Sequence, residues 1–370
     1  MVKNTHLPWP GIIRSAALLA CLTAPAGLRA APAPTEPSAH ARSARENFIS
    51  AADEGSMEAS EGGVTPVPSQ QPSDFDNPPA PPPHPFDENI PAGDVTSGRS
   101  SYGGLRWGGK LRLTNGIASL DGASGGGLAG WAIIAGKETV EGIGASAHIS
   151  YVELPDYNWQ SHGAAIGLFD RFELSYARQN LDTIDVGAAL GLGRSYVLNQ
   201  DVFGAKLRLF GDAVYGPPLL PQIAVGVQYK NNLDDAVTQA IGAKSDDGTD
   251  FYIAATKIVL SQSLLLSGTL RYTKANQLGL LGFGGDKSDD RSLQFEGSLG
   301  YMLSRNLVVG AEYRTKPDNL GIAREDDWWD LFAAWSITDH FTLTAAYADL
   351  GTIAIAEKQR GGLISLQASF

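Results

Sequence analysis

The sequence predicts a transmembrane, up-and-down antiparallel β-barrel preceded by a disordered N-terminal segment. Three observations predict it: a short apolar leader, a period of two in the apolar side chains from about residue 110 onward, and a last strand that ends on an aromatic residue. We expect an all-β fold of about 14 strands, with 12 as the alternative, because single-chain bacterial barrels have even strand numbers.

The last eight residues form the clearest strand of the chain. Apolar and small polar side chains alternate along it, as Ile364, Leu366, Ala368 and Phe370 against Ser365, Gln367 and Ser369. Because successive side chains of a strand point to opposite faces, one face suits lipid and the other suits water. The strand resembles the closing strand of bacterial outer-membrane barrels, so we expect Phe370 to be an assembly signal that the barrel-assembly machinery binds.

The amino end predicts export. Lys3 and Arg14 precede a short apolar stretch at 16–22, and small-residue cleavage sites follow, up to Ala30, so residues 1–30 are interpreted as a signal peptide. The stretch 18–21 also resembles a lipoprotein cleavage box, which leaves lipidation of Cys21 as an alternative, although Leu19 is not a favoured residue there. We therefore expect a protein of the outer membrane of a Gram-negative bacterium, in contact with lipid and lipopolysaccharide.

Composition excludes several classes of function. Cys21 is the only cysteine, so after signal cleavage the chain holds no disulfide, thiol nucleophile or cysteine-bound metal. The formal charge of −12 becomes −15 once the three positive charges of Lys3, Arg14 and Arg29 are removed, which makes nucleic acid a poor partner. No segment is apolar over the roughly 20 residues that a spanning helix needs.

Residues 31–100 differ in composition from the rest of the chain. They are rich in Pro, Ala, Ser and acidic residues, with a proline-rich run at 78–83, and they lack apolar periodicity. Such a segment buries too little apolar surface to offset its ordering entropy. We expect a disordered periplasmic tether, with docking of a periplasmic partner as the alternative, followed by the barrel at 101–370.

Amphipathic stretches of about ten residues recur throughout this barrel region. The predicted strands are 110–120, 128–136, 142–153, 157–169, 171–180, 202–210, 221–230, 250–259, 263–273, 291–302, 305–315, 327–337, 340–349 and 361–370. The first two are the weakest, because residues 104–127 are Gly-rich. Short turns near 170, 262, 305 and 339 alternate with long polar connections, which predicts periplasmic turns and extracellular loops.

Four stretches resemble a proteobacterial outer-membrane family catalogued as domain of unknown function 3034. They are 169–177 (FDRFELSYA), 185–193 (DVGAALGLG), 221–230 (PQIAVGVQYK) and 311–320 (AEYRTKPDNL). The resemblance covers about 110–370 and implies a barrel. It implies no activity, substrate or catalytic residue.

Charged residues share the polar parity of the predicted strands and are candidates for a lumen lining. They are Lys206, Arg208, Lys230, Lys257, Arg271, Glu296, Glu312, Arg314 and Lys316. A Lys or Arg facing mid-bilayer lipid instead would cost about 2–4 kcal/mol. In the turn at Ser304, the register that places Glu296 opposite Arg314 is favoured over the one that places it opposite Glu312, because like charges repel.

Two interpretations of these charges stay open. They form either a constriction that selects small polar or anionic solutes, or a salt-bridge network that fills a narrow or plugged barrel. The first predicts a pore or channel, and the second a non-conducting structural or envelope-interaction barrel.

Catalysis is not predicted. His148, His162 and His340 lack an arrangement that sequence can identify as a triad, and hydrogen-bonded bystanders are the usual explanation for such residues. Acidic loop residues near 246, 289 and 326 are interpreted as solvated carboxylates. We expect no enzyme activity, no cofactor and no metal site.

Overall fold

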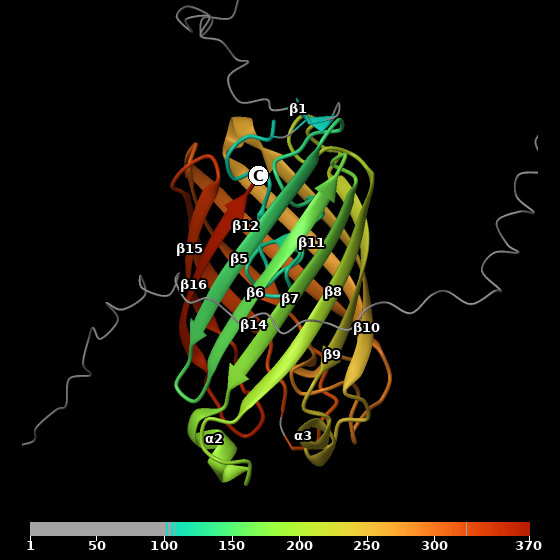
Figure 1. Ribbon diagram of the computed structural model, residues 1–370, viewed down its shortest axis with the longest axis vertical. Helices are drawn as coiled ribbons and strands as arrows, with labels where there is room; N and C mark the ends of the chain where they lie inside the picture. The colour runs from blue at the N-terminus through green and yellow to red at the C-terminus, as the bar shows by residue number, and fades with distance from the viewer. Residues whose placement is uncertain (1–100, 103–104, 107, 323) are drawn as a thin grey trace, which may run out of the picture. The chain divides into compact units, whose positions relative to one another are not determined.

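The chain folds into one closed antiparallel barrel of twelve strands in the computed structural model, which describes residues 101–102, 105–106, 108–322 and 324–370 (Figure 1). The wall strands are β5 (Ile143–Glu153), β6 (Asn158–Leu168), β7 (Phe172–Asp182), β8 (Val197–Phe210), β9 (Gln222–Asn232), β10 (Asp247–Val259), β11 (Leu264–Thr273), β12 (Ser292–Ser304), β13 (Leu307–Arg314), β14 (Trp328–Ser336), β15 (Phe341–Asp349) and β16 (Arg360–Ser369). Each strand pairs with the next along the chain, and β16 closes the wall against β5. The predicted signal peptide and tether lie outside the described residues.

The predicted barrel is confirmed, with twelve wall strands rather than fourteen. The predicted strands 110–120 and 128–136 are wrong: this part of the chain runs inside the barrel and forms only a short hairpin of β3 (Ile117–Ala118) and β4 (Ser124–Gly125). Its backbone groups bond to wall side chains instead of to a neighbouring strand. Two further short strands, β1 (Ser101–Tyr102) and β2 (Leu105–Arg106), pair with each other.

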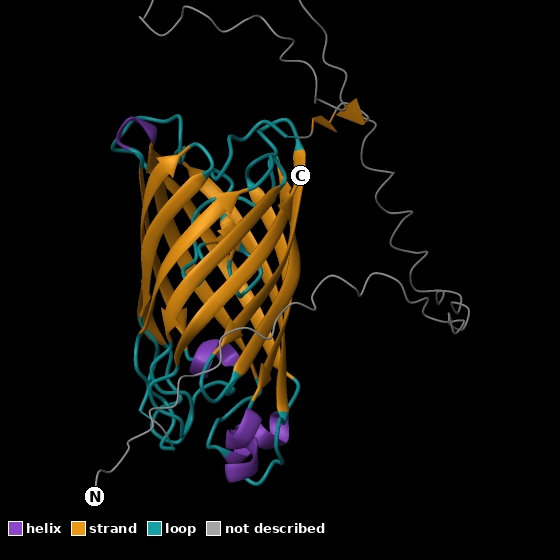
Figure 2. Ribbon diagram, turned by 90° about the vertical axis from the view of Figure 1, so that its left-hand side faces the viewer, coloured by secondary structure: helices purple, strands orange, loops and turns teal. Residues whose placement is uncertain are grey.

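Most short connections lie at one end of the barrel and most long ones at the other, although the short connection 154–157 lies at the long-loop end (Figure 2). The short-turn end holds the turns at 169–171, 260–263, 305–306 and 337–340, the connection 211–221 and the C-terminus. The long-loop end holds α2 (Ile184–Ala189), α3 (Asp235–Ala240), η2 (Asn276–Gly279) and the connections 315–327 and 350–359. Among the described residues, no helix is both long and apolar enough to cross a bilayer.

Large apolar side chains cover the outside of the wall. Ile364 on β16 is 52 % exposed and Phe295 on β12 is 47 % exposed, whereas Ser365 and Gln367 are buried inside. The predicted faces of the last strand are therefore confirmed. Outward aromatic residues lie near the strand ends, among them Tyr229, Tyr272, Tyr313, Trp329 and Tyr347.

An apolar cluster closes the interior at the long-loop end. It contains wall residues such as Trp159 and Trp328, whose rings meet edge to face at 5.7 Å, together with Leu278 from η2 and Ile353 from the last loop. Leu120 and Leu128 from the segment inside the barrel belong to the same cluster, together with further loop residues. The long loops thus fold inward and cover the barrel interior.

Candidate functional site

The candidate site is the lumen, which residues 110–142 occupy. We call this segment the plug. Figures 1 and 2 show it as a loop inside the ring of strands. Its residues from Thr114 to Ala135 are almost all buried. Since the plug has little secondary structure of its own, its polar backbone groups need partners on the wall.

One buried ion pair of the wall holds the plug in two places. Lys206 on β8 lies 3.2 Å from Glu173 on β7, and its ammonium donates to the carbonyl oxygens of Ser124, at 2.7 Å, and Ile133, at 2.8 Å. The Glu173 carboxylate accepts from the backbone N–H of Ser124 and of Ala135. The pair therefore binds the plug at two places, at Ser124 and at Ile133 to Ala135.

Carboxylates of β12 and β13 hold the middle of the plug. Glu296 accepts from the N–H of Gly130 at 2.7 Å, and Glu312 accepts from the N–H of Leu128 at 2.6 Å. A side chain at Gly126 would place its Cβ 1.6 Å from the Glu312 carboxylate. A side chain at this position would therefore push the Glu312 carboxylate away from the Leu128 N–H that it binds.

The Trp131 indole fixes the part of the plug that follows β4. Its Nε1–H donates to Ser298 Oγ at 2.7 Å, and its ring packs against Ile258 and Leu265 of the wall. A buried indole that is both packed and hydrogen-bonded specifies one position.

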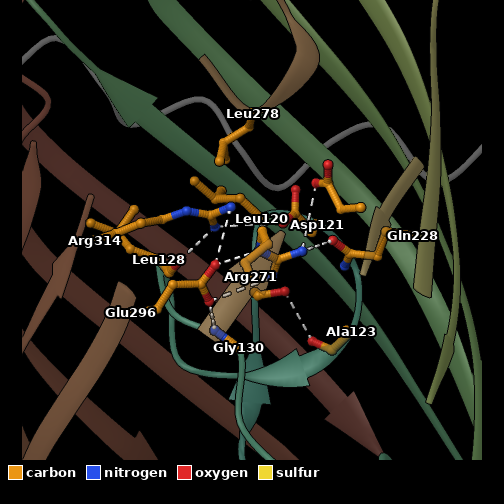
Figure 3. A network of polar contacts seen from close by, with 12 residues as sticks. Leu120, Asp121, Ala123, Leu128, Gly130, Gln228, Arg271, Leu278, Glu296 and Arg314 are labelled. Carbon is orange, nitrogen blue, oxygen red and sulfur yellow. Dashed lines mark hydrogen bonds and ion pairs between the residues drawn. The ribbon is translucent and has the colours of Figure 1, made fainter. Parts of the chain in front are cut away.

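A charged network lies inside the lumen, around the tip of the plug (Figure 3). Arg271 of β11 and Arg314 of β13 both point to the carboxylate of Glu296, with Arg314 Nη2 3.3 Å from Glu296 Oε1. Asp121, at the tip of the plug, places Oδ1 3.4 Å from Lys230 Nζ and Oδ2 3.6 Å from Arg314 Nη1. Lys230 also lies 3.2 Å from Asp250 of β10. The plug thus contributes one carboxylate to a network of the wall.

The predicted register between β12 and β13 is confirmed. Glu296 lies opposite Arg314, and Glu312 lies opposite Ser298. On its other side Glu312 faces Asp330 of β14. The carboxyl oxygens of Asp330 have no hydrogen-bond partner among the described residues, so two acidic side chains face each other on this side of the lumen.

Three of the predicted lumen residues do not lie in the central lumen. Lys257 was expected there, but it pairs with outward-facing Leu266, and its ammonium reaches back to the carbonyls of Asp212 and Gly216 at the short-turn end. The prediction is wrong because β10 places Asp250 and Thr256 inward, and Lys257 has the opposite parity. Arg208 lies at the short-turn end beside Asp170.

Lys316 lies beyond the last residue of β13, in a long loop. It forms a buried pair with Glu325 at 2.9 Å and lies over the Trp328 ring. Burial lowers the pKa of Lys316 and raises that of Glu325. Both shifts disfavour the charged forms, so this pair adds little to the stability of the fold beyond what an apolar pair of similar size would add.

Sequence reasoning missed four lumen carboxylates: Asp121, Glu173, Asp250 and Asp330. Glu173 and Asp330 lie at inward positions of their strands, so the period-two alternation that identified Arg271 could have identified them as well. No periodicity could have placed Asp121, because the plug has none.

The base of the plug lies at the short-turn end, near the C-terminus. The Phe370 carbonyl accepts from the N–H groups of Lys137, at 2.9 Å, and Ala145, at 3.0 Å. The Glu138 carboxylate is completely buried, with Lys110 Nζ 3.6 Å away, and burial raises the pKa of Glu138 to about 7.

The candidate catalytic histidines show no triad among the described residues. His148 Nε2 lies 3.2 Å from Ser161 Oγ, but the Ser161 hydroxyl donates to the Leu120 carbonyl of the plug. The His340 ring stacks on Phe370 at 5.0 Å. Within the described part of the chain, no group of three or more His, Cys, Asp and Glu side chains is arranged to hold a metal ion.

A family model described as a protein of unknown function, DUF3034, matches residues 114–367. The chain belongs to this DUF3034 family. The match includes most of the plug and all of the wall except the end of β16, so both parts are in the region that defines the family. Comparison with curated proteins finds no match for this DUF3034 member.

Solved outer-membrane barrels resemble this DUF3034 member at low identity. The KdgM porin has a TM-score of 0.41 at 10 % identity, covering 61 % of this chain and 99 % of the porin. A NanC porin structure has a TM-score of 0.41 at 11 % identity, with coverages of 61 % and 98 %. Outer membrane phospholipase A from Escherichia coli has a TM-score of 0.35 at 10 % identity, with coverages of 61 % and 91 %. At this level a similarity does not establish a shared activity.

Proposed function

We propose that this protein is an outer-membrane barrel that conducts small polar or anionic solutes when its plug is displaced, and that it is closed while the plug is in place. The closed wall has no unpaired edge, and its outer face is apolar, as a lipid-facing surface must be. The predicted signal peptide and the terminal Phe370, as an assembly signal for the barrel-assembly machinery, support the same location.

The observation that carries the proposal is the charged lining of a filled lumen. Lys206, Lys230, Arg271 and Arg314 are all nearly inaccessible, and each has a carboxylate within 4 Å. Replacing buried ion pairs by apolar residues of similar volume is often neutral or stabilising by about 1–4 kcal/mol. Charges are therefore a poor filler for a permanently closed barrel. They suit a wall that faces water whenever the plug leaves.

A non-conducting structural barrel is the second candidate. The apolar cluster at the long-loop end favours it, because Leu120 and Leu128 of the plug lie within that cluster. Leu113 and Ile117 also pack against Val308 and Phe332 of the wall. Opening requires these contacts to break, and a barrel without transport function would keep them.

A reversible crosslink between plug and wall separates the two candidates. The N–H of Ala132 donates to Thr256 Oγ1 at 2.8 Å, so these two positions are in direct contact and are the pair we choose for a disulfide between plug and wall. With Cys21 replaced by Ser, the Ala132→Cys, Thr256→Cys double variant should show no current in planar bilayers when oxidised and intermittent current when reduced.

Each single-cysteine variant serves as the control, because its current should not respond to the redox change. A folded barrel that stays silent after reduction, with folding confirmed by heat-modifiable migration, would favour the non-conducting candidate.

A further inference from the structure

The plug tip presents a carboxylate to the positive side of the lumen. Asp121 is 3 % exposed, and its two oxygens are divided between Lys230 and Arg314, at 3.4 and 3.6 Å. Gln179 Nε2 adds a donor, 3.3 Å from Asp121 Oδ1. The wall therefore surrounds this carboxylate with two cations and an amide, all on different strands.

The charges of this network balance only when the plug is counted. The wall supplies three cations, Lys230, Arg271 and Arg314, and two carboxylates, Asp250 and Glu296. Three minus two leaves one positive charge, which Asp121 neutralises. Because an uncompensated buried charge is costly, the wall at this depth is built to accept one further anion.

Lys230 has spare capacity for that anion. Its ammonium is completely buried, and the two nearest carboxylate oxygens, of Asp250 and Asp121, lie 3.2 and 3.4 Å away, longer than the about 2.7–2.9 Å of a good charge-assisted hydrogen bond. An ammonium can donate three hydrogen bonds. Asp121 thus neutralises Lys230 without satisfying it, and a free carboxylate with room to adjust its position could do both.

We infer that Lys230, Arg314 and Gln179 form a binding site for the carboxylate of a small organic anion, and that Asp121 occupies this site as an internal substitute while the barrel is closed. The inference rests on the proposed function, because a solute reaches these residues only when the plug moves. Solute and plug then exclude each other, so a solute that binds the open state shifts the population toward it.

The test measures the exposure of the plug in the full chain. In an Ala123→Cys, Cys21→Ser variant, the new thiol lies next to the plug tip and is buried when the plug is docked. Its rate of maleimide labelling therefore reports opening. Sodium gluconate should raise this rate to a plateau. Mannitol at equal osmolarity and sodium chloride at equal ionic strength should not.

Asp121→Asn should raise the labelling rate about tenfold or more without any solute, because it leaves a buried positive charge unpaired, and gluconate should then act at a lower concentration, because its site has lost the internal competitor. Glu138→Gln is the control, since it replaces a buried carboxyl of the same plug by its amide outside this network. It should keep the wild-type response to gluconate.

A double variant distinguishes a lost charge balance from misfolding. Asp121→Asn with Lys230→Gln restores the charge balance, so its labelling rate should return toward the wild-type value, in a non-additive way. Gluconate that acts no more strongly than mannitol, on a barrel whose Asp121→Asn variant does open, would overturn the carboxylate site alone. A barrel that stays silent in the crosslink experiment would instead overturn the proposed pore.

Discussion

The wall and the plug of this protein are held by different kinds of interaction. Wall strands are joined by regular backbone ladders, from β5 through β16 and back to β5. The plug has only the short β3–β4 pair, and its backbone is bound by wall side chains such as Glu173, Lys206 and Glu312. We therefore expect the wall to form without the plug, whereas the plug takes its conformation from the wall.

Substitutions on the outer face of the wall should affect insertion, and substitutions on its inner face should affect closure by the plug. Phe295→Arg puts a charge on the outer face, where it should destabilise the inserted barrel by about 2–4 kcal/mol near mid-bilayer. Ser267→Arg points inward, so the barrel should insert, but the larger side chain should disturb Thr256, which binds the plug. Heat-modifiable migration measures insertion. An equal loss of the folded band in both variants would contradict the assignment of Phe295 to the outer face and of Ser267 to the inner face.

Removing the Trp131 side chain, one of the contacts that hold the plug, should leave the wall intact. Trp131→Ala deletes a buried indole with a hydrogen bond, which should weaken plug docking by about 3–5 kcal/mol. Proteolysis of residues 110–142 should accelerate while the heat-modifiable band persists. Trp335→Ala, on the outer face, is the control and should leave the plug protected. Loss of the folded band in Trp131→Ala would mean that wall and plug form one cooperative unit.

The smallest expected effect concerns the base of the plug and depends on pH. Burial raises the pKa of Glu138 from its ordinary 4.5 to about 7, so the folded state binds the proton more tightly than the unfolded state. The stability that this proton supplies is complete below about pH 4.5 and is lost as the pH rises through 7. Urea unfolding should show wild type losing stability relative to Glu138→Gln between pH 5 and 8. Parallel pH profiles would contradict a buried, protonated Glu138.

Parity along the strands predicted much of the wall and part of the site. It placed Arg271, Glu296 and Arg314 on one face and, with charge repulsion, the register that joins the last two. It failed at Lys257, because a long side chain near a strand end can reach the polar rim from the outer face. The role of Phe370 in assembly stays a prediction.

The sequence by itself determined the barrel, because a strand in a closed wall needs only local information: an apolar residue at every second position and a polar turn at each end. It did not determine what fills the lumen. The Gly-rich plug lacks periodicity, and its position follows from partners such as Glu173 and Lys230, which are distant in sequence. Only the tertiary structure shows that Asp121 completes the charges of the wall, because that balance exists only when strands β9 to β13 and the plug share one interior.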